Sequence, residues 1–426
     1  MLTKLCHFVG KPIVHSRVLQ LTSSSIALKH NQSCRSLSSL LDPTSLRYWK
    51  HPNATIPTGS TLFEEDKPII REAKIVSLSD PDDDANSALH KGELPIGARL
   101  LQIGTKFDDF DIEALKLEEP NVIFCSHPLA RIPLGQLLEA LPTVEWVHSR
   151  SAGIDFVTSP TLSKSKVIMT NARGQFSSTL AEYTLLACSY FAKDLPRLLS
   201  QQRSYKWEKY NVSELRGATL GIVGYGDIGR ACAKLAKIYG MRVVALRRNP
   251  QLAWNDPLCD KVLPSTTESL QELVSESDYI LVSAPLTDET RGLMGRDQFQ
   301  QTKRGAVFIN VGRGPVVDEQ ALLEALQNGT LKGAALDVFT EEPLPQDSPL
   351  WALENVLLSP HNMVRTQRKN LFFSLCVTIC VYMYTQAMVI SQSMGSVRIK
   401  RQPLCMKRLN FLFKKMFLVL CGEKNY

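Results

Sequence analysis

The chain has 426 residues, of which 44% are hydrophobic and 21% charged, and its formal net charge is +7. This composition excludes collagen, a coiled coil, a small disulfide scaffold and a fully disordered chain, and the length allows two or three domains. The positive charge lies at the ends: residues 1–41 carry +5, residues 362–426 carry +10, and residues 42–361 are left at −8. Because the body has no basic surface for nucleic acid, we expect no DNA or RNA partner.

The first 41 residues are rich in serine, contain single basic residues and lack acids before Asp42. This composition is typical of a transit peptide and predicts location in an organelle matrix, of a mitochondrion or a chloroplast. The alternative is a disordered extension on a cytoplasmic protein. The cysteines before residue 361 form no C-x-x-C pair and have no metal-ligand spacing, so we expect free thiols and no metal site.

From about residue 74, short apolar runs alternate with longer amphipathic stretches, which indicates parallel sheets covered by helices. The first series contains a predicted helix at 133–141. A long predicted helix follows at 177–202, with Ser177, Ser178 and Thr179 as suitable capping residues. The predicted strands of this series are 74–78, 99–103, 121–125, 144–148 and 166–169.

A second series begins after Gly217. Its predicted strands are 219–223, 242–246, 278–283, 306–310, 332–336 and 355–358. Its first predicted helix follows a glycine-rich turn and ends at about Tyr239, and the others are 266–275, 294–302 and 318–327. We therefore predict an α/β fold with two doubly wound parallel-sheet domains. They are a flavodoxin-like substrate domain at 66–200 and a Rossmann cofactor domain at 205–361.

A glycine-rich turn, GYGDIG, follows the first strand of the second series and opens a helix. Its first glycine allows a tight turn, its second lets a diphosphate approach the backbone, and its third lets the helix pack closely on the strand. The helix N-terminus favours negative charge, so the turn predicts dinucleotide binding. The predicted cofactor-binding residues of the turn are Gly224, Gly226, Asp227, Ile228 and Gly229.

The end of the next strand carries Arg247 and Arg248, where an NAD site places an acidic residue for the ribose hydroxyls. An acid would repel a 2′-phosphate, whereas two guanidinium groups would hold it. The pair therefore favours NADP(H) over NAD(H). The alternative is that both arginines are solvated and the site accepts either cofactor.

Seven sequence blocks together resemble the D-isomer-specific 2-hydroxyacid dehydrogenase family, in particular its glyoxylate and hydroxypyruvate reductases. The blocks keep the family's order and spacing up to His361. The resemblance implies reduction of a 2-oxo acid to a D-2-hydroxy acid by a nicotinamide cofactor, in a cleft between two domains of a homodimer. The blocks are 147–155 (VHSRSAGID), 171–182 (NARGQFSSTLAE), 224–229 (GYGDIG), 283–290 (SAPLTDET), 309–314 (INVGRG), 336–343 (LDVFTEEP) and 359–361 (SPH).

The resemblance assigns catalytic roles to Arg313, Glu342 and His361. Arg313 would grip the substrate carboxylate and polarise the carbonyl, since its planar guanidinium matches a carboxylate. His361 would donate the proton, and Glu342 would favour its protonated form and fix its tautomer. Glu341 is the neighbouring competitor for the role of Glu342.

Further positions match the family's binding loops. The loop whose backbone N–H groups would receive the substrate carboxylate is Ser151, Ala152 and Gly153, small residues that let a ligand touch the backbone. The remaining predicted cofactor contacts are Pro285, Thr290, Val311 and Asp337. For Thr290, ordinary capping of its loop is an alternative.

Arg150 departs from the family pattern in this loop, and it either reaches a second anionic group on the substrate or lies exposed. The first possibility supports an alternative function, an NAD-linked dehydrogenase of a phosphorylated hydroxy acid.

The resemblance stops after His361, and residues 362–426 form an atypical basic and apolar tail. Its uncharged run at 371–390 is long enough to span a bilayer at about 1.5 Å per residue, although polar residues dilute it. We favour translated non-coding sequence over a membrane anchor or a soluble extension. Without the family's returning helix, His361 is expected to be poorly oriented. The chain would then bind NADP(H) but be unstable or weakly active, or it would serve as a non-catalytic dinucleotide-binding protein.

Overall fold

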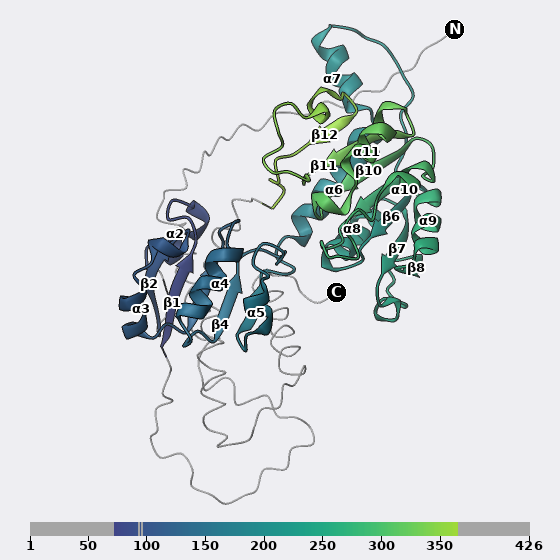
Figure 1. The fold of residues 1–426 in the computed structure, drawn as a ribbon. Helices are drawn as coiled ribbons and strands as arrows, with labels where there is room; N and C mark the ends of the chain where they lie inside the picture. The colour runs from purple at the N-terminus through teal and green to yellow at the C-terminus, as the bar shows by residue number, and fades with distance from the viewer. Residues whose placement is uncertain (1–71, 93, 95–96, 365–426) are drawn as a thin grey trace, which may run out of the picture. The chain divides into compact units, whose positions relative to one another are not determined.

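The computed structural model describes residues 72–364, except residues 93, 95 and 96. The predicted transit peptide and the apolar run at 371–390 lie outside the described residues. The described residues belong to one compact unit that starts at Pro68, and they form two parallel sheets with helices between the strands (Figure 1). The predicted pair of doubly wound α/β domains is confirmed.

The first sheet has five strands in the order β2-β1-β3-β4-β5, which is the flavodoxin-like order. Its strands are β1 (Ala73–Leu78), β2 (Ala98–Gly104), β3 (Val122–Cys125), β4 (Trp146–Ser149) and β5 (Ile168–Asn171). Its helices are α2 (Ser87–His90), α3 (Ile112–Glu118), α4 (Arg131–Ala140) and α5 (Pro160–Lys164). Helices α3 and α5 were not predicted because they are short; Asp111 and Ser159 cap them.

The second sheet has seven strands in the order β12-β11-β10-β9-β6-β7-β8, the order of a Rossmann sheet extended by one strand. Its strands are β6 (Thr219–Val223), β7 (Arg242–Arg247), β8 (Lys261–Pro264), β9 (Tyr279–Val282), β10 (Ala306–Asn310), β11 (Leu331–Leu336) and β12 (Val356–Leu358). Its helices are α8 (Asp227–Ile238), α9 (Thr267–Glu276), α10 (Arg296–Gln300) and α11 (Glu319–Gln327). The edge strand β8 was missed because it is short and ends in proline.

Short 3₁₀ turns complete the connections. They are Asp84–Asn86, Phe107–Asp109, Pro250–Leu252, Gly314–Val316 and Pro349–Ala352.

The predicted single helix at 177–202 is wrong: the structure has α6 (Ser177–Ala192) and α7 (Leu195–Arg203). Asp194 breaks the helix because its backbone is left-handed, with φ of 52°, and its side chain accepts a hydrogen bond from the Arg197 N–H. The predicted serine cap is also wrong. Phe176 precedes α6 without a side-chain cap, and the Ser177 hydroxyl is buried without a hydrogen-bond partner.

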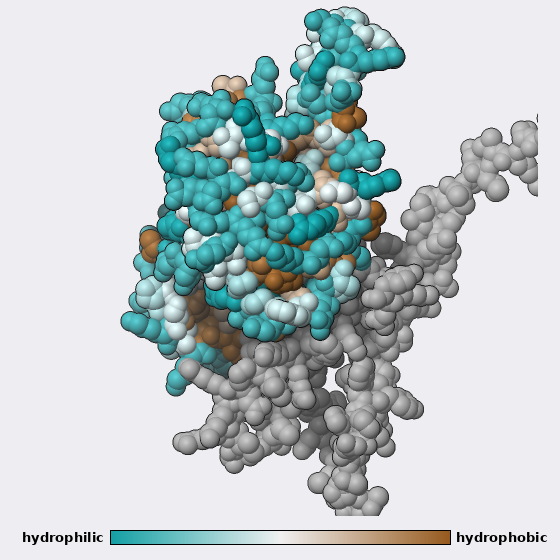
Figure 2. All heavy atoms as spheres, turned by 90° about the vertical axis from the view of Figure 1, so that its right-hand side faces the viewer, coloured by the Kyte–Doolittle hydropathy of each residue, from teal (hydrophilic) through white to brown (hydrophobic). Residues whose placement is uncertain are grey.

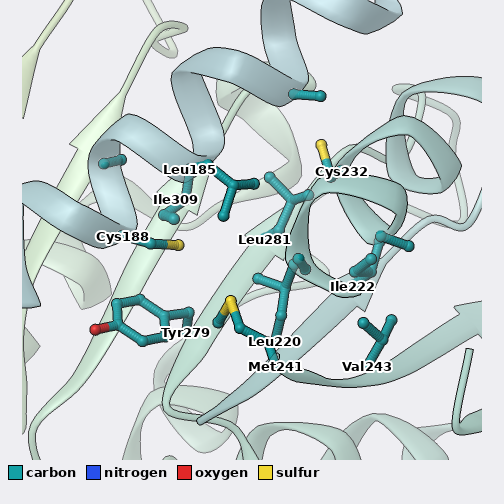
Figure 3. Packing of buried hydrophobic residues seen from close by; sticks show 14 of the residues in the cluster. Leu185, Cys188, Leu220, Ile222, Cys232, Met241, Val243, Tyr279, Leu281 and Ile309 are labelled. Carbon is teal, nitrogen blue, oxygen red and sulfur yellow. The ribbon is translucent and has the colours of Figure 1, made fainter. Parts of the chain in front are cut away.

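Helix α6 packs on the second sheet rather than on the first. Leu185 and Cys188 of α6 lie in the same buried cluster as Leu220, Leu281 and other residues of the second sheet (Figure 3). Burial of this apolar face removes it from water, which is the main source of its stability. By packing, α6 therefore belongs to the cofactor domain, and this differs from the expected substrate-domain limit at residue 200.

Apolar side chains are concentrated inside both domains. The face shown in Figure 2 is mostly hydrophilic, with apolar residues in separate patches. Among the described residues, no helix is both long and apolar enough to cross a membrane.

Candidate active site

The predicted diphosphate turn lies between β6 and α8. Gly224 has φ of +98°, and a Cβ atom there would lie 2.5 Å from the backbone nitrogen of Ala284, so only glycine fits. A Cβ atom at Gly229 would lie 2.8 Å from the Gly224 carbonyl oxygen, which shows how closely α8 approaches the strand. By contrast, a Cβ atom at Gly226 would meet nothing within 4 Å. This open space before the first turn of α8 fits a diphosphate bound to the helix N-terminus.

The next two residues of the turn have other contacts. Asp227 begins α8, and its carboxylate accepts a hydrogen bond of 2.5 Å from the Arg173 guanidinium, which follows β5. This ion pair joins the two domains beside the cofactor turn. Ile228 packs against the buried cluster of the cofactor domain.

The two arginines of the predicted 2′-phosphate site lie at the end of β7. Arg247 is its last residue and is half-buried, and Arg248 is exposed. The loop that follows is tied to the glycine-rich turn by Asp256. Its Oδ2 accepts hydrogen bonds from the Tyr225 hydroxyl (3.1 Å) and the Arg230 Nε (2.6 Å). Burial opposes ionisation of Asp256, but these donors outweigh it and hold the pKa of this carboxyl below its ordinary value. These hydrogen bonds were not predicted, because nothing in the sequence spacing connects Asp256 with Tyr225 and Arg230.

Arg313 lies beyond β10 and contacts the first domain. Its Nε donates to Asp155 Oδ1 at 3.1 Å, its Nη1 donates to the Gly312 carbonyl at 2.9 Å, and its side chain is 25% exposed. A Cβ atom at Gly153 would lie 1.6 Å from Arg313 Nη2. The structure therefore brings the predicted substrate loop and the predicted carboxylate-binding arginine into direct contact, and glycine at this position makes the contact possible.

Glu342 and His361 form an ion pair or hydrogen bond, with 2.9 Å between Oε2 and Nδ1. Oε1 of Glu342 accepts from the Phe339 N–H at 3.0 Å, which orients the carboxylate. Burial opposes ionisation of Glu342, but the bonds from His361 and Phe339, together with the nearby Arg313 charge, lower the pKa of the carboxyl. Thus Arg313, Glu342 and His361 are brought together, and Glu342 rather than Glu341 contacts the histidine.

Asp337 holds the turn that carries His361. It is 1% exposed, and its Oδ1 accepts from the Ser359 hydroxyl at 2.6 Å, from the Asn362 N–H at 3.0 Å and from the Met363 N–H at 3.3 Å. Burial raises the pKa of this carboxyl, although the three donors oppose the rise. The hydrogen bonds of Asp337 show that it holds the histidine turn, and its expected place near the nicotinamide stays a prediction. Ser359, which precedes Pro360 and His361 in the sequence, was the feature that could have indicated this role of Asp337.

The other predicted cofactor contacts lie near the carboxyl ends of β9 and β10. The Thr290 hydroxyl donates to the Pro285 carbonyl at 2.6 Å and accepts from the Thr287 N–H at 2.8 Å, so it caps its own loop. Val311 is buried, and its N–H donates to the Val282 carbonyl at 3.1 Å. These contacts fix the backbone that borders the cofactor turn.

The rest of the substrate loop is bound to the ends of β4 and β5. The carbonyl of Ala152 accepts from the Asn171 amide at 2.6 Å, and the Ser151 N–H donates to the Ser149 hydroxyl at 3.3 Å. His148 lies within β4 and is buried, which lowers its pKa to about 4. In the described ranges, no group of three or more His, Cys, Asp or Glu side chains could hold a metal ion.

Comparisons with known proteins identify a family, related sequences and structures of the same fold. The family "D-isomer specific 2-hydroxyacid dehydrogenase, NAD binding domain" matches residues 185–362. A glyoxylate reductase of Aeropyrum pernix is 32% identical over 277 residues, which cover 63% of this chain and 81% of the relative. A D-3-phosphoglycerate dehydrogenase of Methanocaldococcus jannaschii is also 32% identical, but the match covers 54% of this chain and 44% of that protein. A D-isomer specific 2-hydroxyacid dehydrogenase of Xanthobacter autotrophicus, solved with NADPH and MES, is 29% identical with a TM-score of 0.56 and covers 70% of this chain and 91% of its own.

Proposed function

Because the chain belongs to the D-isomer-specific 2-hydroxyacid dehydrogenase family, we propose that it reduces glyoxylate, hydroxypyruvate or a similar small 2-oxo acid to the D-2-hydroxy acid. It is an NAD(P)-dependent dehydrogenase that acts on a CH–OH group. The observation that carries the proposal is the pairing of Glu342 with His361 close to Arg313, which itself touches the substrate loop at Gly153.

Each group has a defined part in the reduction. The glycine-rich turn would hold the diphosphate of the nicotinamide cofactor, which would supply the hydride when bound. Arg313 holds the substrate carboxylate against the loop at Gly153 and polarises the carbonyl. His361 donates a proton to the carbonyl oxygen through the ring nitrogen that Glu342 does not bind. Glu342 fixes this tautomer, and Asp337 fixes the backbone of the histidine turn.

The phosphorylated-acid alternative has less support. The phosphoglycerate dehydrogenase relative matches over less than half of its own length, whereas the glyoxylate reductase matches over 81%. Arg150, which could have bound the phosphate, is paired with Asp83 at 2.7 Å. A plain 2-oxo acid therefore suits the site better.

NADP(H) is the proposed preference. Arg247 and Arg248 follow β7, and the loop beyond them is held by Asp256. The relative from Xanthobacter autotrophicus was solved with NADPH. Replacing Arg247 with Asp should lower the ratio of kcat/KM with NADPH to that with NADH by at least about tenfold. An unchanged ratio would show that the arginines do not hold the 2′-phosphate.

We also propose that the protein forms a homodimer and that it is located in an organelle matrix. The segment after α7 exposes 98% of Tyr205 and 92% of Trp207, which would be costly surface for an isolated protomer and suits an isologous contact. Light scattering on the full chain and on a Trp207→Ala variant tests the assembly, and a monomeric full chain would refute it. Import of the full chain into isolated mitochondria and chloroplasts, compared with a chain that lacks residues 1–41, tests the location.

The decisive assay is oxidation of NADPH and NADH by the full chain with glyoxylate, hydroxypyruvate and their phosphorylated analogue. We expect fast turnover of the plain acids with NADPH. NADPH binding without turnover of any of these acids would instead support a non-catalytic dinucleotide-binding protein.

A further inference from the structure

One buried carboxylate fixes the loop between β7 and β8 to the glycine-rich turn. The side chain of Asp256 is 10% exposed, and its Oδ2 accepts from the Tyr225 hydroxyl at 3.1 Å and from Arg230 Nε at 2.6 Å. Its Oδ1 accepts from Arg230 Nη2 at 3.3 Å and from the Leu258 N–H at 3.2 Å. Tyr225 belongs to the glycine-rich turn, and Arg230 lies in the first turn of α8. Asp256 therefore binds the turn, the helix that follows it and its own loop.

Tyr225 connects the two sides of the segment that carries the arginines of the proposed 2′-phosphate site. Its N–H donates at 2.9 Å to the carbonyl of Leu246, which directly precedes Arg247 in β7. Its side chain is buried, and its hydroxyl interacts with the Cys259 thiol as well as with Asp256. The tyrosine thus contacts the chain before the two arginines through its backbone and the chain after them through its hydroxyl.

Consecutive backbone turns relate Asp256 to the arginines. The Asp256 N–H donates to the Ala253 carbonyl at 3.0 Å, and the Ala253 N–H donates to the Pro250 carbonyl at 2.9 Å. Pro250 follows Arg248 by two residues. Ala253 is 4% exposed and packs in the core of the cofactor domain. The short segment from Arg248 to Asp256 is therefore ordered by its own turns, by the core and by the carboxylate at its end.

An ordered loop favours the cofactor that needs the loop most. A binding site that is already ordered loses less conformational entropy when the ligand binds. If the binding conformation is populated only part of the time, the apparent affinity falls by that fraction. NADH lacks the 2′-phosphate and does not need the two arginines, so its affinity should depend less on the loop than the affinity of NADPH does.

We propose that Asp256 is a positioning residue for cofactor discrimination. It holds the loop in the conformation in which Arg247 and Arg248 receive the 2′-phosphate of NADP(H). This inference rests on the proposed preference for NADP(H) and names the residue that supports it from outside the phosphate contact.

The main test is isothermal titration calorimetry of the full chain with NADPH and with NADH, in the absence of substrate. In Asp256→Ala, the ratio of the NADPH affinity to the NADH affinity should fall at least about fivefold relative to wild type. The ratio is measured because the variant frees Arg230, whose charge would attract the diphosphate that both cofactors share. This attraction changes both affinities in the same sense and largely cancels in the ratio.

Asp260→Ala is the matched control. The carboxylate of Asp260 accepts from Lys237 Nζ of α8 at 2.9 Å and from the Val243 N–H of β7 at 2.7 Å. It therefore joins the same helix and strand as Asp256 does, but at the start of β7 instead of its end. Asp260→Ala should also lower the stability in urea unfolding, yet it should keep the wild-type affinity ratio. An equal fall of the ratio in the two variants would show a general loosening of the domain and would overturn the inference.

Tyr225→Phe keeps the test independent of how well Asp256→Ala folds. It removes one hydroxyl from the buried network and leaves the ion pair between Asp256 and Arg230 in place. The affinity ratio should then fall about threefold, the effect of one hydrogen bond. An unchanged ratio in either folded variant would overturn the inference.

The same titrations separate this inference from the proposed function. If wild type prefers NADPH and Asp256→Ala keeps that preference, only the inference fails. If wild type binds NADPH no better than NADH, the proposed preference fails and the inference fails with it. Absence of turnover with every 2-oxo acid, together with the expected affinity ratios, would count against the proposed reduction alone, because the titrations contain no substrate.

Discussion

Replacement of Gly153 by alanine tests whether Arg313 must lie against the substrate loop. The added Cβ atom would lie 1.6 Å from Arg313 Nη2, whereas atoms in contact lie about 3.5 Å apart, so the guanidinium must retreat by about 2 Å. Only the ends of two side chains, those of Arg313 and Asp155, have to move, so the free energy of unfolding should change by no more than about 1 kcal/mol. Misplacement by about 1 Å already costs about 100-fold in rate, so kcat/KM should fall at least about 100-fold, or about 2.7 kcal/mol.

The assay combines steady-state NADPH oxidation with urea unfolding of the same preparations. Gly135→Ala is the control, because its Cβ would lie in ordinary contact, 3.7 Å from the Thr161 hydroxyl oxygen, within α4. This variant should keep full activity and gain about 0.5–1 kcal/mol of stability from the helix. If a folded Gly153→Ala enzyme turned over like the wild type, Arg313 would not act from the position that it occupies here.

Three further predictions concern the histidine turn and the core. Asp337→Ala should lower kcat at least about tenfold, because it removes the acceptor that holds the turn of His361. Asp337→Asn keeps the Oδ1 acceptor and should retain most of the rate. Equal losses of kcat in the two variants would show that the charge of Asp337 matters instead. The pKa of Glu342 is lowered from 4.5, so wild type should exceed Glu342→Gln in thermal stability above pH 4.5. This advantage should fade as the pH drops through the lowered pKa, and a pH-independent difference would contradict the cause. Leu185→Ala should cost about 2–5 kcal/mol of stability in denaturant unfolding, because Leu185 is 4% exposed in the core, and Leu186→Ala, 55% exposed, is its control.

The strands were largely predictable because apolar runs in parallel sheets are buried on both faces and stand out from amphipathic helices. The break between α6 and α7 could not be predicted, because Asp194 adopts a left-handed conformation that a helical sequence pattern does not reveal. Glycine spacing indicated the cofactor turn, because close backbone approach requires that residue type. Sequence patterns could not reveal three acidic residues that bind other side chains, namely Asp155, Asp256 and Asp83. Each contacts an arginine or tyrosine that is distant in sequence, and only the packing of the sheets brings them together.

The orientation of His361 also differs from what the unusual tail led us to expect. Without the family's returning helix, the histidine was expected to be poorly oriented. In the structure, Glu342 binds its ring, and Asp337 accepts from the Asn362 and Met363 N–H groups that follow it, both within the Rossmann domain. Asp337 is itself fixed at the end of β11, where its N–H donates to the Asn310 carbonyl of β10. Two neighbouring strands thus carry both sides of the site, since β10 leads to Arg313 and β11 leads to the carboxylates that hold His361. The contacts that hold His361 and its turn therefore come from the second sheet.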